Sequence, residues 1–279
     1  MAWTVPNEVQ DIPAEGLGDK IVAVRQGFVA PLADWKLIVR NLDGSHPCIL
    51  SQSDVNSYSR DMLQRGFPGL APRPSLDGRN LVWAERFVDE QGQKAKRVQA
   101  YDLSTGQLRT LAETTDVAHA DLWAPTVSGD TAGWLEQQAS GEVRQVLVSL
   151  SGGPFRALTL PEVPRSSAVL DDGRFLALSL ESQTVVIELA SSEATRVTDF
   201  GAWMYSNGHA ISWAPISGHV GFYDAAARTI HLIDTRGAET VDAYVMGSYF
   251  VWQEFRTPSA NATEVGPRTS AFYAVRLEN

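Results

Sequence analysis

A glycine followed by a short apolar run recurs six times along the 279 residues of this chain. The glycines lie 35 to 60 residues apart, at Gly18, Gly78, Gly129, Gly173, Gly208 and Gly247. The fifth residue after the glycine is a tryptophan in four repeats, at Trp83, Trp134, Trp213 and Trp252, and Ala23 or Leu178 in the other two. Self-similarity at such a period is typical of propellers and solenoids, so the chain is expected to consist of repeated units.

Each repeat continues with alternating apolar and polar residues that end in a Gly or Asp turn, as in residues 98–106 and 146–153. A period of two residues indicates strands, and such turns indicate hairpins. The sequence therefore predicts an all-β fold, a six-bladed β-propeller of four-stranded antiparallel blades. Each blade would bury both faces against its neighbours, with the repeated tryptophans in the core.

The repeats predict one domain over residues 1–279, because large all-β domains often reach this size. The predicted blades span approximately residues 18–60, 66–118, 124–163, 167–200, 206–240 and 245–279. The last repeat has no fourth strand, whereas residues 1–15 precede the first repeat and have strand composition. We therefore expect the N-terminal segment to complete the last blade and close the ring. Pro6 fits an outer edge, where a missing N–H donor costs least.

Two segments carry a family resemblance. Residues 73–83 and 124–134 each combine a proline, a Ser-x-Asp turn with a glycine in or next to it, and an apolar strand that ends in tryptophan. They resemble the repeat of TolB-like β-propellers, most clearly in the second and third blades. The resemblance implies the architecture, including closure by the N-terminus. The family's role with partner proteins is not carried over.

The net charge of the chain limits the classes of partner that it can bind. A formal net charge of −10 disfavours nucleic-acid binding, which needs clustered Lys and Arg. No apolar stretch reaches the length of a membrane span. The first residues show no secretory signal and Cys48 is the only cysteine, so a cytoplasmic location is expected. We expect a monomer without membrane or nucleic-acid partners, and a partner protein remains an alternative.

A ligand pocket is predicted at one mouth of the central channel, where the loops entering the first strand of each blade would converge. These loops are rich in aromatic and acidic residues and also contain arginines. Aromatic rings stack on sugars or bind cations, and arginine binds carboxylates. The alternative is that the rings cap the channel and the aspartates cap turns. The predicted ligand-binding residues are Arg60, Asp61, Phe67, Trp123, Arg165, Trp203, Tyr205, Asp242 and Tyr244.

The candidate catalytic residues are His119, Asp121 and Tyr205, with His119 and Asp121 as an acid–base pair. The sequence contains no metal-binding histidine pair, nucleotide-binding loop or serine-hydrolase elbow, so neither a cofactor nor a metal site is expected. Three functions stay open. The first is a small-molecule-binding propeller, which can also be a cofactor-independent cyclase, lyase or hydrolase. The others are a carbohydrate-binding module and a protein–protein interaction scaffold.

Overall fold

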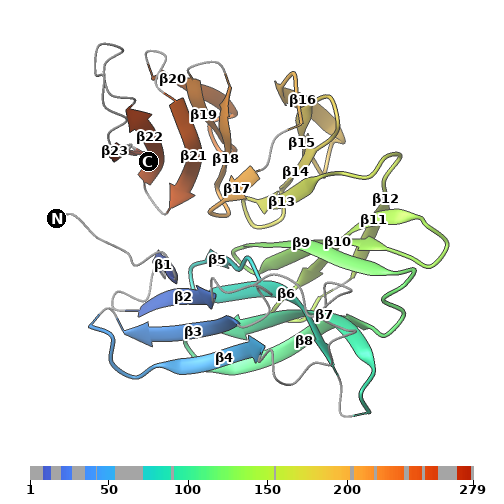
Figure 1. Ribbon diagram of the computed structural model, residues 1–279. Coiled ribbons are helices and arrows are strands. Elements are labelled where there is room, and N and C mark those ends of the chain that lie inside the picture. Colours follow the sequence, from blue (N-terminus) through green and yellow to red (C-terminus); the bar gives the residue numbers. More distant parts are fainter. Residues whose placement is uncertain are drawn as a thin grey trace, which may run out of the picture. The chain divides into compact units, whose positions relative to one another are not determined.

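The computed structural model describes residues 9–13, 20–26, 35–41, 43–53, 72–88, 91–153, 155–201, 204–216, 219–235, 239–246, 249–256 and 269–277. These residues form strands and turns without any helix, which confirms the all-β prediction (Figure 1). Accordingly, no helix in the described part of the chain could cross a membrane. The chain divides into two compact units, residues 1–161 and 162–279, and each is described by itself.

The first unit contains three antiparallel sheets, each built from strands that follow one another in the chain (Figure 1). The first sheet consists of β1 (Val9–Pro13), β2 (Lys20–Gln26), β3 (Trp35–Asn41) and β4 (Cys48–Ser53). The second consists of β5 (Ser75–Asp77), β6 (Asn80–Val88), β7 (Lys94–Asp102) and β8 (Gln107–Thr114). The third consists of β9 (Asp121–Ser128), β10 (Thr131–Gln137), β11 (Val143–Ser149) and β12 (Arg156–Thr159).

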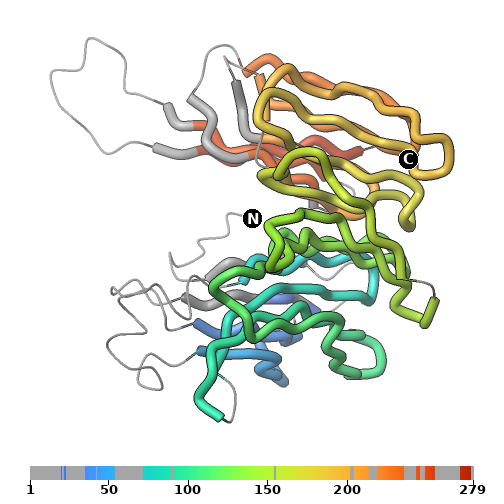
Figure 2. The backbone as a smooth tube through the Cα atoms, turned by 90° about the vertical axis from the view of Figure 1, so that its right-hand side faces the viewer, coloured from blue at the N-terminus to red at the C-terminus, as the bar shows by residue number. Residues whose placement is uncertain are grey.

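The second unit continues the same pattern, and Figure 2 traces its chain back and forth through consecutive strands. The fourth sheet consists of β13 (Ser166–Leu170), β14 (Phe175–Ser179), β15 (Thr184–Glu188) and β16 (Glu193–Thr198). The fifth consists of β17 (Met204–Ser206), β18 (Ala210–Ile216), β19 (His219–Asp224) and β20 (Thr229–Asp234). The sixth consists of β21 (Glu239–Met246), β22 (Tyr249–Arg256) and β23 (Thr269–Arg276).

The turn glycines of the predicted repeats occupy the same place in four sheets, between the first and second strands. Gly78, Gly129, Gly173 and Gly208 all have a φ between 54° and 87°. Glycine adopts this left-handed conformation without steric cost, which explains why it recurs at these turns. Gly18 and Gly247 lie outside the described residues.

The repeated tryptophans form part of the core. Trp83, Trp134, Trp213 and Trp252 lie on the second strands of their sheets, and all are at most 7% exposed. They pack with apolar residues of neighbouring sheets in the same unit. The sequence prediction of core tryptophans is therefore confirmed.

The N-terminal segment is placed differently from the prediction. β1 pairs with β2 in the first sheet, with Val9 opposite Arg25 and Pro13 opposite Ile21, so it does not supply a fourth strand to the last sheet. The reason is local: β1 precedes Gly18 as β5 precedes Gly78, and pairing with the next strand closes only a short loop. Among the described strands five sheets have four strands and the sixth has three. The described strands therefore do not confirm six blades of four strands each.

Candidate functional site

Tyr205 and Tyr244 lie in contact in the second unit and are called here the tyrosine pair. Tyr205 is on β17, opposite Ser212 of β18, and Tyr244 is on β21, opposite Val251 of β22. Their ring centroids are 4.4 Å apart with the rings tilted by 55°. Both side chains are half-buried. The structure therefore brings together two predicted site residues from the first strands of two different sheets.

A series of ring contacts links the two sheets that carry the tyrosine pair. Phe222 of β19 stacks on His231 of β20 with centroids 4.5 Å apart, and lies 5.0 Å from Phe250 of β22. Trp252 continues the series, 5.6 Å from Phe250 and 5.4 Å from Tyr273 of β23. Such ring packing is directional, so it fixes the fifth and sixth sheets against each other. The two sheets that carry the tyrosine pair therefore share one apolar cluster.

Asp121 lies in the first unit and acts as a counter-ion. Its Oδ1 is 2.6 Å from Nζ of Lys96 on β7 and accepts a hydrogen bond from the Leu122 N–H at 2.8 Å. The Lys96 side chain is buried, and a buried ammonium requires a charged partner. Trp123, two residues further along β9, is half-buried and lies opposite Leu135 of β10.

The predicted acid–base pair of His119 and Asp121 is not formed, because each residue has another partner. The His119 ring Nδ1 lies 2.9 Å from Oδ1 of Asp116, three residues earlier in the same turn. The His119 backbone N–H also donates to the Asp116 carbonyl, at 3.2 Å. A partner within the turn is reached at little entropic cost, whereas Asp121 is held by Lys96.

Of the other predicted site residues, the structure describes Arg165 and the backbone of Asp242. Arg165 is exposed, and its backbone N–H donates to the Ser179 carbonyl at 2.8 Å, just before β13 begins. Asp242 belongs to β21, at the register shift between Thr240 and Ala243, and its side chain lies outside the described residues. The positions that lie wholly outside the described residues are Arg60, Asp61, Phe67 and Trp203.

Sequence reasoning missed a buried carboxylate in the first unit, Glu85. It accepts hydrogen bonds from the Trp83 indole N–H at 2.9 Å and from Ser51 of the first sheet. An Arg97 guanidinium nitrogen lies 2.5 Å from Oε1. The sequence signal was the spacing Trp-x-Glu, which places indole and carboxylate on one face of a strand.

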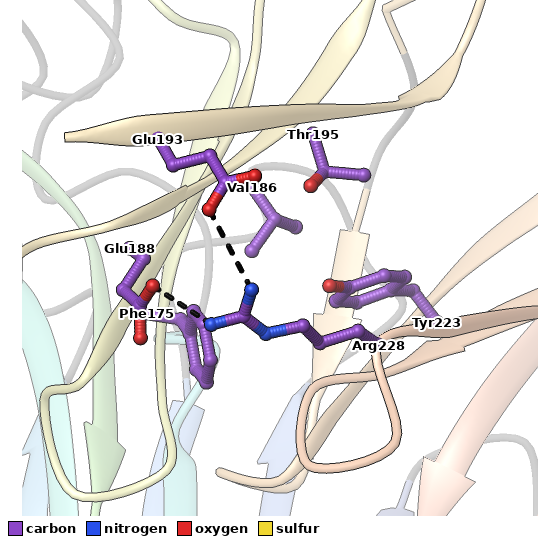
Figure 3. A pocket seen from close by; sticks show the side chains of 7 residues that line it. All are labelled: Phe175, Val186, Glu188, Glu193, Thr195, Tyr223 and Arg228. Carbon is purple, nitrogen blue, oxygen red and sulfur yellow. Dashed lines mark hydrogen bonds and ion pairs between the residues drawn. The ribbon is translucent and has the colours of Figure 1, made fainter. Parts of the chain in front are cut away.

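A small pocket lies between the fourth and fifth sheets (Figure 3). Its cavity volume of about 10 Å³ is roughly the space that one water molecule needs, so no organic ligand fits in it. Figure 3 shows the Arg228 guanidinium directed at two carboxylates, 2.7 Å from Glu188 and 3.6 Å from Glu193. Its lining residues are Phe175, Val186, Glu188, Glu193, Thr195, Tyr223 and Arg228.

The charges in this pocket are already paired. The hydrogen bond from Arg228 lowers the pKa of Glu188, and the same bond raises the pKa of Arg228. Arg174 adds a second guanidinium, 3.1 Å from Glu188. The pocket is therefore a structural ion-pair network. Within the described residues no group of three or more His, Cys, Asp or Glu side chains is arranged to hold a metal ion.

Comparison with known proteins finds similarity in fold, but none in sequence. No family model and no curated protein sequence matches it. Among solved structures it is similar to the β-propeller domain of the Trilobed protease from Pyrococcus furiosus, which has an open velcro topology. That similarity has a TM-score of 0.56 at 9% identity and covers 89% of this chain and 79% of the other. The fold is that of a β-propeller.

Two further propellers extend the comparison. A prolyl endopeptidase matches with a TM-score of 0.56 at 13% identity over 97% of this chain. The propeller described here spans only 41% of the length of that peptidase. An oligogalacturonate lyase, solved in complex with manganese, matches with a TM-score of 0.50 at 11% identity, over 93% of this chain and 74% of the lyase. At these identities the likeness concerns the fold alone.

Proposed function

We propose that this chain is a TolB-like propeller of six blades that binds a small organic molecule through the tyrosine pair. The observation that carries the proposal is the contact of Tyr205 with Tyr244, 4.4 Å apart on the first strands of two sheets. Half-buried tyrosines offer a ring face for stacking and a hydroxyl for hydrogen bonding. Trp203 and Asp242 stand two residues away in sequence and would add a second ring and a carboxylate.

The catalytic form of this proposal is a cofactor-independent hydrolase or lyase. In it the Tyr205 hydroxyl would hold or transfer a proton while the propeller confines the substrate. The fold likeness to a prolyl endopeptidase and an oligogalacturonate lyase supports the choice of short peptides and oligogalacturonates as first probes. Oligogalacturonates also test the carbohydrate-binding alternative.

The test measures the affinity of these probes by isothermal titration calorimetry. Tyr205→Ala and Tyr244→Ala should each weaken binding at least about tenfold, the loss of roughly one stacking contact. The matched control is Tyr249→Ala, because Tyr249 lies on β22 of the same unit and is 48% exposed. It should bind as the unaltered protein does. The proposal fails if both tyrosine-pair variants bind the probes normally. It also fails if the variants that lose binding have lost their cooperative melting transition as well, because the loss is then one of folding.

A second candidate is a protein-interaction scaffold. The observation that favours it is the exposure of apolar side chains on outer strands, Leu232 on β20 and Phe272, 67% exposed, on β23. Apolar outer strands are common sites of protein contact. Leu232→Asp and Phe272→Asp should abolish binding to a protein partner and leave small-molecule binding unchanged, which separates the two functions.

A further inference from the structure

The outer strand of the fifth sheet, β20, is regular along its whole length. All six of its residues pair with β19 without a register shift. The outer strands β4, β8 and β16 each show a register shift in the pairing with their inner neighbour. Proteins commonly protect outer strands from pairing with other chains by such bulges, by lysine or by proline. Residues 229–234 contain neither lysine nor proline, so β20 lacks all three forms of protection.

β20 is also accessible to solvent. Five of its six residues are exposed, among them Ile230 at 40% and Leu232 at 63%. The four central residues of β19, the neighbouring strand, are buried. A strand paired to the outer side of β20 would cover much of these side chains. The exposure of Ile230 and Leu232, called here the β20 strip, therefore shows that another chain can reach this side of the sheet.

Carboxylates outnumber guanidinium groups around the β20 strip. Asp234 is exposed and lies on the same face as the strip, because alternate residues of a strand project to one side. At the other end, Arg228 lies 2.7 Å from Glu188 and 3.6 Å from Glu193 (Figure 3). Arg174 also contacts Glu188, whereas Glu193 makes the longer contact with Arg228 and its side chain is 66% exposed. This surface is therefore complementary to a positively charged partner.

We propose that β20 binds an extended, positively charged segment of a partner protein, which adds a strand to the fifth sheet. Main-chain hydrogen bonds give such complexes their affinity, and alternate side chains give their specificity. Apolar side chains of the segment would cover the β20 strip, and a Lys or Arg would meet Glu193 or Asp234. A second copy of this chain is disfavoured, since each copy has a formal net charge of −10.

This inference rests on the scaffold candidate above and names the chemistry of its partner, and it does not involve the tyrosine pair. Random heptapeptides displayed on phage are the probe. They are selected on the unaltered protein and counter-selected on Leu232→Asp, so that peptides that need Leu232 remain. The surviving peptides should carry apolar residues at alternate positions and a net positive charge. Should Leu232→Asp not melt cooperatively, Leu232→Ser takes its place in the counter-selection.

An enriched peptide is then synthesised and titrated by fluorescence anisotropy. Its Kd should rise at least about tenfold with Leu232→Ser, which removes an apolar contact, and about threefold with Glu193→Gln, which removes an exposed charge. The matched control is Leu108→Asp, because Leu108 is 47% exposed on β8, the outer strand of a sheet in the other unit. This variant and Tyr205→Ala should bind the peptide normally. Bound peptide should also slow the hydrogen exchange of β20 and leave that of β8 unchanged.

The proposal is overturned if no peptide survives the counter-selection, or if the survivors carry no excess of Lys and Arg. It is also overturned if bound peptide leaves the hydrogen exchange of β20 unchanged. Peptides that bind Leu232→Asp normally and lose binding with Phe272→Asp would give a different result for the two ideas. The scaffold candidate would then stand, and the assignment of its contact surface to β20 would be wrong.

Discussion

Glu85 links the first and second sheets, because its carboxylate accepts a hydrogen bond from Ser51 of the first sheet. Its side chain is 1% exposed and forms an ion pair with Arg97. Removing one partner of a buried pair leaves the other charge uncompensated, at a cost of about 3–5 kcal/mol. We expect Glu85→Ala to lower the free energy of unfolding by about 3 kcal/mol in urea denaturation. Arg79→Ala, which removes a more exposed ion pair, that of Arg79 with Asp102 at 3.5 Å, should cost clearly less.

Asp130 makes the stability of the first unit depend on pH. Burial alone would raise the pKa of Asp130, but hydrogen bonds from the Ser149 and Ser151 hydroxyls outweigh it and lower that pKa below its ordinary value of 3.8. A carboxyl with a lowered folded pKa stabilises the fold above its unfolded pKa, and this contribution disappears as pH falls through the folded value. The unfolding free-energy difference between the unaltered protein and Asp130→Asn should therefore be constant near neutrality and shrink below about pH 4.

The control for this pH dependence is Asp199→Asn, because the Asp199 side chain is 81% exposed. It should change the free energy of unfolding little at any pH. Urea denaturation at neutral pH and at about pH 3 measures both variants. If the unfolding free-energy difference between the unaltered protein and Asp130→Asn stays the same in acid, the pKa of Asp130 is not lowered.

At the scale of the strand and its turn, Gly78 sets the hairpin between β5 and β6. Its φ is 54°, and a Cβ placed there would meet no atom within 4 Å. The cost of Gly78→Ala is therefore purely conformational, about 1–2 kcal/mol. Gly78→Asn should cost less, because asparagine tolerates the left-handed region. Urea denaturation of the two variants tests this, and an equal or smaller loss for alanine would show that the turn adopts another conformation.

Gly221 shows how one strand makes room for a tryptophan of its neighbour. It lies on β19 opposite Trp213 of β18, and a Cβ would stand 2.6 Å from Trp213 Cζ2 and 2.9 Å from Leu232 Cδ2. Gly221→Ala should thus destabilise by about 1–3 kcal/mol through overpacking. Trp213→Phe frees part of this space, so the double variant should lose less stability than the two single losses combined. If the two stability losses simply add, the side chain of Trp213 does not contact the position of Gly221.

The repeat pattern predicted the strands and turns because the left-handed turns favour glycine and the core positions favour tryptophan. Both residue types can be read directly from the sequence. The same repeat pattern placed Tyr205 and Tyr244 in corresponding loops of two repeats, and their rings are in contact in the structure. It failed where spatial partners depend on register: Arg97 reaches Glu85 through strand pairing, which spacing alone does not reveal. It also failed for His119, because several acids stand near it in sequence and only the folded turn selects Asp116.

At the scale of the whole molecule, each compact unit has its own apolar clusters. Val98, Leu122, Trp134 and Val146 form one in the first unit, and Ala177, Val186, Ile211 and Trp213 belong to one in the second. Two units with separate cores can unfold independently or as one cooperative domain. The repeat pattern over residues 1–279 predicts the second behaviour, since a propeller blade buries its faces against neighbours on both sides.

Hydrogen exchange of Glu85→Ala decides between these behaviours. The slowest amides exchange through global unfolding, so a destabilisation of about 3 kcal/mol should speed them roughly a hundredfold wherever unfolding is shared. The reporter in the second unit is β14, Phe175–Ser179, whose residues are all buried. In one cooperative domain its amides should accelerate as much as those of β10, because the substitution in β6 then weakens every blade. Acceleration confined to residues 1–161 would instead mean that the two units are separate folding domains.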